Sequence, residues 1–225
     1  MAPPTLLVIG GNGQTGVEVI RACAASAAKP PVHAFCRTPS KLSESDAAHC
    51  VSVIEGDARS AEDIARALEQ AKPDAVVVAV GRSEDLGPTD VRAASAKALM
   101  DSVAPGEKFD QVKIVVVSSV GAGGTKLHIG FGIGMLLGMR LKHVLADHDR
   151  QEKEIWDRLA DQKNRALVLH TTGLTTGQPA GEVCIFEGKI PHPRIDRAVV
   201  ARFIVAELCG TCPNFGKAIS ITTKK

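Results

Sequence analysis

The chain has 225 residues, of which 44% are hydrophobic and 23% are charged, and its formal net charge is +2. These proportions are typical of one globular domain and exclude a disordered chain. The charges are spread along the sequence and no apolar run reaches about 18 residues, so neither a nucleic-acid partner nor a membrane-spanning helix is expected.

The cysteines indicate a reducing compartment. A chain of this size and apolar content needs no disulfides, and no signal peptide precedes the first apolar run, so we expect reduced thiols and a cytoplasmic location. Cys209 and Cys212 form one CxxC pair, but no second pair lies at zinc spacing, so no metal site is predicted.

Short apolar runs alternate with segments of helical periodicity along the chain. The first run ends in a cluster of glycines, and Ser60 is the expected N-cap of the second helix, with Asp63 at its third position. In chain order the sequence predicts a strand at 5–9, a helix at 14–27, strands at 32–36 and 51–54, a helix at 61–71, a strand at 75–80, a helix at 91–103, a strand at 112–117, a helix at 143–159, a strand at 166–169, a helix at 197–208 and a strand at 218–221.

This alternation predicts an α/β protein with a single Rossmann domain over residues 1–225, in which a doubly wound, mostly parallel sheet carries helices on both faces. In such sheets ligands bind along the edge where the strands end. The irregular segments 120–142 and 171–195 both follow strands, and we expect them to overhang this edge as lids.

The strongest motif is Gly10-Gly-Asn-Gly-Gln-Thr-Gly16, between the first strand and the first helix. It fits both GxGxxG (Gly11, Gly13, Gly16) and GxxGxxG (Gly10, Gly13, Gly16). Glycines permit a tight turn and a close approach of the backbone to a pyrophosphate, while the helix N-terminus offers free N–H groups to the phosphates. The motif therefore predicts a dinucleotide site.

The residues after the second strand indicate which dinucleotide is bound. An acidic residue there would hold the ribose 2′-hydroxyl of NAD. The sequence instead offers Arg37, Ser40 and Lys41, and a guanidinium can pair bidentately with a 2′-phosphate. We therefore predict NADPH as the cofactor; the alternative is that these bases form only a solvated surface.

Five segments together resemble the atypical short-chain dehydrogenase/reductase family, in its NmrA-like, NAD(P)H-binding branch, and within it most closely the flavin reductases, also called biliverdin-IXβ reductases. The segments are GGNGQTG (10–16), FCRTPSKL (35–42), VIEGDARSAEDIARAL (53–68), DAVVVAVGRSEDLGPTDV (74–91) and KIVVVSSVG (113–121). The chain contains no tyrosine, so the YxxxK pair of most dehydrogenases in the wider superfamily is excluded.

The resemblance implies a role for each matching residue. The pyrophosphate would be held by Gly10, Gly13, Gln14, Thr15 and Gly16, the 2′-phosphate by Arg37 with Ser40 and Lys41, the adenine by Asp57 and Ala58, the ribose by Val80, Gly81 and Arg82, and the nicotinamide by Ser118, Ser119, Gly173 and Leu174. The substrate histidine of flavin reductases aligns with Gly173, and His170 is expected to lie further back in its strand.

Two residues are candidates for chemistry on the acceptor. Ser119 could hydrogen-bond the acceptor or the carboxamide, or simply be satisfied by backbone. His148, beside Asp147, could supply a proton, although a solvated helix face is the commoner explanation for such a pair. Phe131, Met135 and Met139 share one face of a possible helix, which could cover a substrate, pack a dimer or belong to the core.

These observations predict an NADPH-dependent oxidoreductase that transfers a hydride to a flat small-molecule acceptor such as a flavin or quinone. The alternative is a non-catalytic, NADP-binding, redox-responsive regulator of the NmrA-like type. A monomer or homodimer without nucleic-acid or membrane partners is expected.

Overall fold

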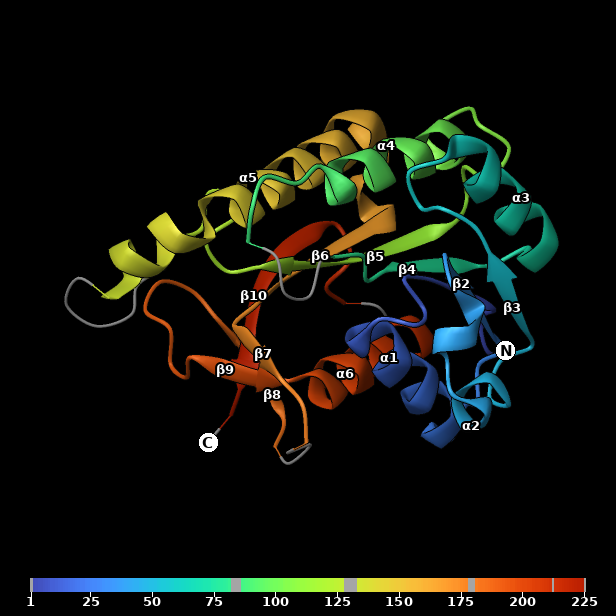
Figure 1. Cartoon of the computed structure of the whole chain (residues 1–225), viewed down its shortest axis with the longest axis horizontal. Helices are drawn as coiled ribbons and strands as arrows, with labels where there is room; N and C mark the ends of the chain where they lie inside the picture. The colour runs from blue at the N-terminus through green and yellow to red at the C-terminus, as the bar shows by residue number, and fades with distance from the viewer. Residues whose placement is uncertain (1, 82–85, 128–132, 178–180, 212, 225) are drawn as a thin grey trace.

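An eight-stranded sheet forms the centre of the molecule (Figure 1). The computed structural model describes residues 2–81, 86–127, 133–177, 181–211 and 213–224. The strands are β1 (Leu6–Ile9), β2 (Val32–Cys36), β3 (Ser52–Glu55), β4 (Ala75–Val78), β5 (Lys113–Ser119), β6 (Ala166–Thr171), β7 (Gly173–Thr175), β8 (Val183–Phe186), β9 (Arg194–Asp196) and β10 (Lys217–Thr223). The helices are α1 (Gln14–Ala25), α2 (Glu44–Ala47), α3 (Ala61–Ala71), α4 (Val91–Val103), α5 (Ile133–Leu159) and α6 (Arg197–Cys209), with 3-10 turns at Pro39–Lys41 and Ala160–Arg165.

The strand order places the ligand-binding edge of the sheet. The order is β3-β2-β1-β4-β5-β6-β10-β8, and all neighbours are parallel except β8, which runs antiparallel to β10. The chain winds outward from β1 through β2 to β3 and then returns to β4, on the other side of β1. The predicted single-domain Rossmann fold is thus confirmed, and its topological switch point lies between β1 and β4. A separate parallel pair, β7 and β9, lies beyond the main sheet.

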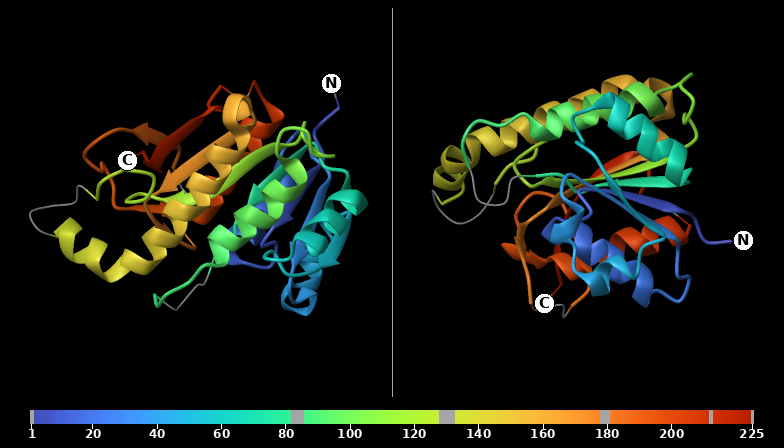
Figure 2. Two further views of the ribbon diagram at one scale, coloured as in Figure 1. Left: turned by 90° about the horizontal axis from the view of Figure 1, so that it is seen from above. Right: turned by 45° about the vertical axis from the view of Figure 1, so that its right-hand side comes forward.

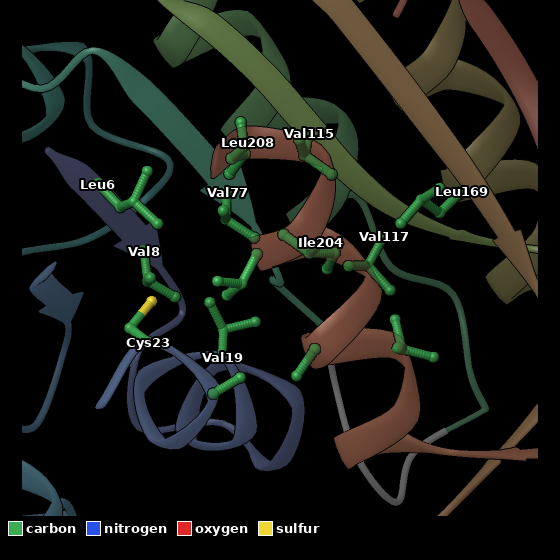
Figure 3. Close-up of a cluster of buried hydrophobic side chains, with 14 of the residues drawn as sticks. Leu6, Val8, Val19, Cys23, Val77, Val115, Val117, Leu169, Ile204 and Leu208 are labelled. Carbon is green, nitrogen blue, oxygen red and sulfur yellow. The ribbon is translucent and has the colours of Figure 1, made fainter. Parts of the chain in front are cut away.

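Both faces of the sheet are covered by helices, because successive residues of each buried strand point to opposite faces. Leu6 and Val8 pack with α1 and α6 on one face (Figure 3), while Leu7 and Ile9 belong to the cluster under α3, α4 and α5. The two helical layers lie on opposite sides of the sheet (Figure 1). This explains why the strands read as continuous apolar runs rather than as alternating ones.

Most predicted elements are confirmed, and α3 and α4 have the expected bounds. Ser60 caps α3, since its hydroxyl accepts a hydrogen bond from the backbone N–H of Asp63 at 3.2 Å. The short helix α2 and the strands β7, β8 and β9 were not predicted, because three or four residues carry too little periodicity. Among the described residues no helix combines the length and apolarity needed to cross a bilayer.

The start of α5 differs from the prediction. The helix begins at Ile133 rather than at His143, so the segment expected to be irregular up to residue 142 is helical from 133 onward. The glycines at 134 and 138 suggested irregular backbone, but the methionines and leucines between them are strong helix formers. Of the three alternatives for Met135 and Met139, core packing is wrong, since their exposed fractions are 69% and 56%. Phe131 and Cys212 lie outside the described residues, and Cys23, Cys36, Cys50 and Cys184 are free thiols.

Asp147 of α5 is fully buried and joins this helix to the start of α4. Its carboxylate accepts hydrogen bonds from the backbone N–H groups of Arg92 at 3.1 Å and Ala93 at 3.2 Å, and from the Arg92 guanidinium at 3.4 Å. These N–H groups belong to the first turn of α4, whose own N-cap, Asp90, makes no capping hydrogen bond. Asp147 therefore caps a neighbouring helix, and the buried Arg92 balances its charge.

We expect Asp147→Ala to lower the free energy of unfolding by about 3–5 kcal/mol, because it leaves the buried guanidinium of Arg92 without its counter-charge. Urea denaturation at neutral pH measures the loss. Asp157→Ala is the matched control on the same helix; its exposed pair with Lys153 should contribute less than about 1 kcal/mol. Equal losses for the two variants would contradict the capping role.

Candidate functional site

The glycine turn brings the backbone of β1 into close contact with α1. A Cβ at position 16 would lie 2.2 Å from the carbonyl oxygen of Gly10, and Gly10 itself has φ +89°. Only glycine fits either position without shifting the backbone. The N-cap of α1, Gly13, brings no capping side chain, so the N–H groups of the first helical turn face outward and suit an anion.

A cleft of about 500 Å³ runs along the ends of β1, β4, β5 and β6 above this turn. It contains ten of the residues predicted from the sequence. They are Gly13, Gln14, Thr15, Val80, Gly81, Ser118, Ser119, His148, Gly173 and Leu174. Residues more than 150 positions apart in the chain therefore meet at the edge of the sheet where the strand order predicts a ligand.

Arg37 lies in a second pocket, of about 520 Å³, at the ends of β2 and β3. Three acidic residues line the same pocket: Asp57 is paired with Arg59 at 2.6 Å, Asp63 is paired with Arg66 at 2.7 Å, and Glu55 completes the lining. The exposed guanidinium of Arg37 has neither a hydrogen bond nor an ion pair with any residue in the described ranges. It is thus available to an anionic ligand.

The remaining predicted residues are less closely grouped. Ser40 and Lys41 are exposed at the 3-10 turn after β2. Ala58 belongs to the buried core cluster beneath the Arg37 pocket, and Arg82 lies outside the described residues. The pKa of Asp57 is lowered to about 2 by the hydrogen bonds from Arg59, so this carboxylate stays charged beside Arg37.

A buried chain of polar groups lies at the bottom of the cleft. The hydroxyl of Ser118 donates to the carboxylate of Glu152, whose two oxygens each lie 3.0 Å from Nε2 of His170. Nδ1 of His148 lies 3.3 Å from the same hydroxyl oxygen. Because the single proton of Ser118 goes to Glu152, its oxygen can only accept from His148. This assigns the proton of the neutral His148 ring to Nδ1 and leaves Nε2 as an acceptor.

The structure decides between the two explanations offered for Asp147 and His148. Neither is part of a solvated face: Asp147 is inaccessible and His148 is 6% exposed. Burial, aided by the nearby charge of Arg92, lowers the pKa of His148 to about 3. The ring is therefore neutral near pH 7, which argues against an imidazolium acid and favours a hydrogen-bonding role toward whatever occupies the cleft.

Arg92 and Glu152 were not identified from the sequence. Arg92 lies beneath the cleft, where a Cβ on Gly81 would come within 2.7 Å of its guanidinium. The available signal for Glu152 was its spacing, four residues after His148, which places both on one face of α5. The hydroxyl of Ser119 donates to the backbone carbonyl of Val120 at 3.1 Å. This fits the alternative in which the backbone satisfies the serine, and the hydroxyl can still rotate toward a ligand.

An apolar pocket of about 630 Å³ adjoins the cofactor-sized cleft. The two share the wall formed by Ser119, Leu141 and residues 171–174. Its further walls come from Leu127 and Leu137 on one side and from the segment between β8 and β9 on the other. A ligand in this apolar pocket would therefore lie next to a second ligand whose end reaches Ser119 in the cleft.

Comparison with known proteins agrees with this geometry. A family model described as NAD(P)H-binding matches residues 10–209. No curated protein matches the chain significantly.

Several solved structures share the fold. A provisional NAD-dependent epimerase/dehydratase from Bacillus halodurans has 20% identity and a TM-score of 0.75, covering 99% of this chain and 95% of its own. ChuY, an anaerobilin reductase from Escherichia coli O157:H7, has 20% identity and a TM-score of 0.69, covering 98% of each chain. A short-chain dehydrogenase/reductase from Veillonella parvula, in complex with NADP, has 16% identity and a TM-score of 0.70, covering 97% of this chain and 94% of its own.

The low pKa of His148 predicts a pH dependence of stability. Between the folded pKa of about 3 and the ordinary histidine pKa of 6.5, the unfolded chain binds a proton that the folded chain does not, so stability falls as the pH falls. From pH 6.5 to pH 5 this group should remove up to about 2 kcal/mol from the free energy of unfolding. Urea denaturation at both pH values checks this.

His148→Gln should lose less stability than the wild type over the same interval, since glutamine does not titrate. His192→Gln, at a half-buried histidine near β9, is the control and should leave the pH dependence unchanged. The assignment fails if His148→Gln keeps the full wild-type dependence.

Proposed function

Since the chain belongs to the NAD(P)H-binding family, we propose that it is an NADPH-dependent oxidoreductase that transfers a hydride to a flat acceptor such as a flavin or quinone. The observation that carries the proposal is the pair of adjoining cavities. A dinucleotide-sized cleft meets a mostly apolar pocket at Ser119 and residues 171–174, which is the arrangement that direct hydride transfer between two stacked rings requires.

The residues present fit a dinucleotide. The N–H groups at the start of α1 would bind the pyrophosphate, and Gly13 leaves room for the phosphate oxygens. Ser118, Ser119 and the backbone of Gly173 would position the nicotinamide end. The bound cofactor supplies the hydride, and the protein orients the rings and excludes water.

The reduction of a flavin or quinone consumes one hydride and one proton. The cleft offers the Ser119 hydroxyl, which can turn from Val120 toward an acceptor, whereas the Ser118 proton is held by Glu152. We assign Ser119 to acceptor orientation and His148 to positioning, with its Nε2 accepting a hydrogen bond. The proton comes from solvent and reaches the acceptor through the Ser119 hydroxyl.

One observation favours the second candidate function, an NADP-binding redox-responsive regulator. Within the described residues the cleft presents no charged acid: His148 is neutral with its proton turned toward Ser118, and the carboxylate of Glu152 is buried behind that serine. A site that binds NADPH tightly but protonates an acceptor poorly suits a sensor.

Measurement of NADPH oxidation with FMN, FAD, quinones and biliverdin, beside calorimetry of NADPH binding, tests the proposal. Leu127→Trp should narrow the apolar pocket, raising KM for the acceptor with little change in NADPH affinity. Gly13→Val is the matched control at the other cavity, where a side chain blocks the phosphate oxygens and abolishes binding and turnover together. NADPH binding without oxidation by any acceptor would replace the enzyme with the regulator.

The NADP assignment predicts a preference for NADPH over NADH of roughly ten- to hundred-fold, because a hydrogen bond to a charged group contributes about 1.5–3 kcal/mol. Arg37→Ala should remove most of this preference and leave NADH binding nearly unchanged. Lys41→Ala should do less, since a flexible, exposed ammonium pairs less specifically. Titrations of the wild type and both variants at fixed ionic strength measure this.

If the wild type binds both cofactors equally, or if Arg37→Ala weakens both equally, Arg37 does not recognise the 2′-phosphate. Arg66→Ala serves as the control in the same pocket, because that guanidinium is already paired with Asp63.

A further inference from the structure

The first turns of α5 expose an unusual group of apolar side chains. Met135, Leu136, Leu137 and Met139 have exposed fractions between 38% and 69%, and they are four of the seven large hydrophobic residues that are exposed in the described part of the chain. They lie at the end of α5 that projects beyond the sheet (Figures 1 and 2). We name residues 133–142 the α5 tip. Of these side chains, Leu137 also lines the apolar pocket beside Leu127.

The charged residues of the α5 tip and of the sequence on either side of it are all basic. No aspartate or glutamate occurs between Asp110 and Asp147. Within this stretch Lys126, Arg140 and Lys142 are exposed, and none of the three forms an ion pair with a residue that the structure describes. The tip thus combines exposed methionine and leucine side chains with unpaired positive charge.

This combination does not suit a second copy of the chain. A symmetric dimer through the α5 tip would bring the basic residues of both copies together without an acidic residue to balance them, which is unfavourable. It does suit an anionic lipid surface, which attracts exposed bases and accepts apolar side chains beneath its headgroups. A projecting helix end can insert among the lipid headgroups. Docking on another protein would instead require a groove in that protein that matches the helix end.

We propose that the α5 tip docks this protein on an anionic lipid surface. Composition predicts no membrane partner, because the apolar run here is broken by glycines and is too short to span a bilayer. A helix that lies in the interface needs no such length.

The same helix turns form part of the apolar pocket. Leu137 and Leu141 line that pocket together with Leu127, so docking through the tip places the pocket against the lipid. The acceptor class that follows is a lipid-dissolved one, such as a quinone with an apolar tail; this second part rests on the proposed function. Such a molecule would reach the wall at Ser119 without crossing water.

Flotation with vesicles tests the docking, without cofactor or acceptor. The full chain should float with vesicles of equal parts phosphatidylcholine and phosphatidylglycerol and bind phosphatidylcholine vesicles at least about five-fold more weakly, since each base near an anionic surface contributes about that factor. Binding should weaken with added salt. Failure of the wild type to float with the mixed vesicles would overturn the proposal.

Surface variants separate the two contributions. Met135→Ser/Met139→Ser should weaken binding to the mixed vesicles about ten-fold or more, since two buried apolar side chains are lost. Arg140→Ser/Lys142→Ser should remove most of the preference for the mixed vesicles and leave only the contribution of Lys126. The controls are Val51→Ser, which is 64% exposed on another surface, and Lys163→Ser; neither should change flotation. Equal losses in the controls would contradict the assignment.

Two measurements identify the other outcomes. Gel filtration in which Met135→Ser/Met139→Ser converts a dimer to a monomer would show that a second copy covers the tip, and the proposal would be wrong. For the acceptor, NADPH oxidation by a long-tailed quinone in mixed vesicles should fall in the tip variants, while oxidation by a short, water-soluble quinone should not. Flotation without any oxidation would reject the proposed function and leave the docking intact.

Discussion

Two carboxylates buried on α5, Asp147 and Glu152, must each be matched by groups from other elements, and this requirement fixes the helix against the domain. Asp147 is matched by Arg92 and the first N–H groups of α4, and Glu152 by Ser118 of β5 and His170 of β6. An unmatched buried carboxylate would cost several kcal/mol. The position of α5 in turn sets the far wall of the cleft, the side of the apolar pocket and the direction in which the α5 tip projects.

The two halves of the site are therefore built differently. The half that suits the dinucleotide consists largely of backbone, at the glycine turn and the ends of the strands, and depends on the absence of side chains. The half that suits an acceptor consists of side chains from α5 and from the segment between β8 and β9. Backbone recognition of a phosphate is shared by many proteins, whereas the acceptor half depends on the identity of individual side chains.

The same difference explains how far the sequence could be interpreted. The buried strands, α3, α4 and the glycine turn were predictable because local periodicity and local sterics determine them. The start of α5 was not, since Gly134 and Gly138 suggest irregular backbone when the surrounding helix formers are not weighed. Glu152 and Arg92 were missed because their importance arises from contacts between residues 18 to 55 positions apart. The burial of His148 likewise depends on packing that no local pattern reveals.

The loop after β5 lies directly on the hydrogen-bonded pair of Glu152 and His170. A Cβ at position 123 would come within 2.2 Å of a carboxylate oxygen of Glu152 and 2.7 Å of Nε2 of His170, and the backbone N–H of Gly123 is already bound to Asp149 at 2.8 Å. A side chain at position 123 would therefore displace the Glu152 carboxylate and the His170 ring, and with them the hydrogen bonds that link α5 to β6.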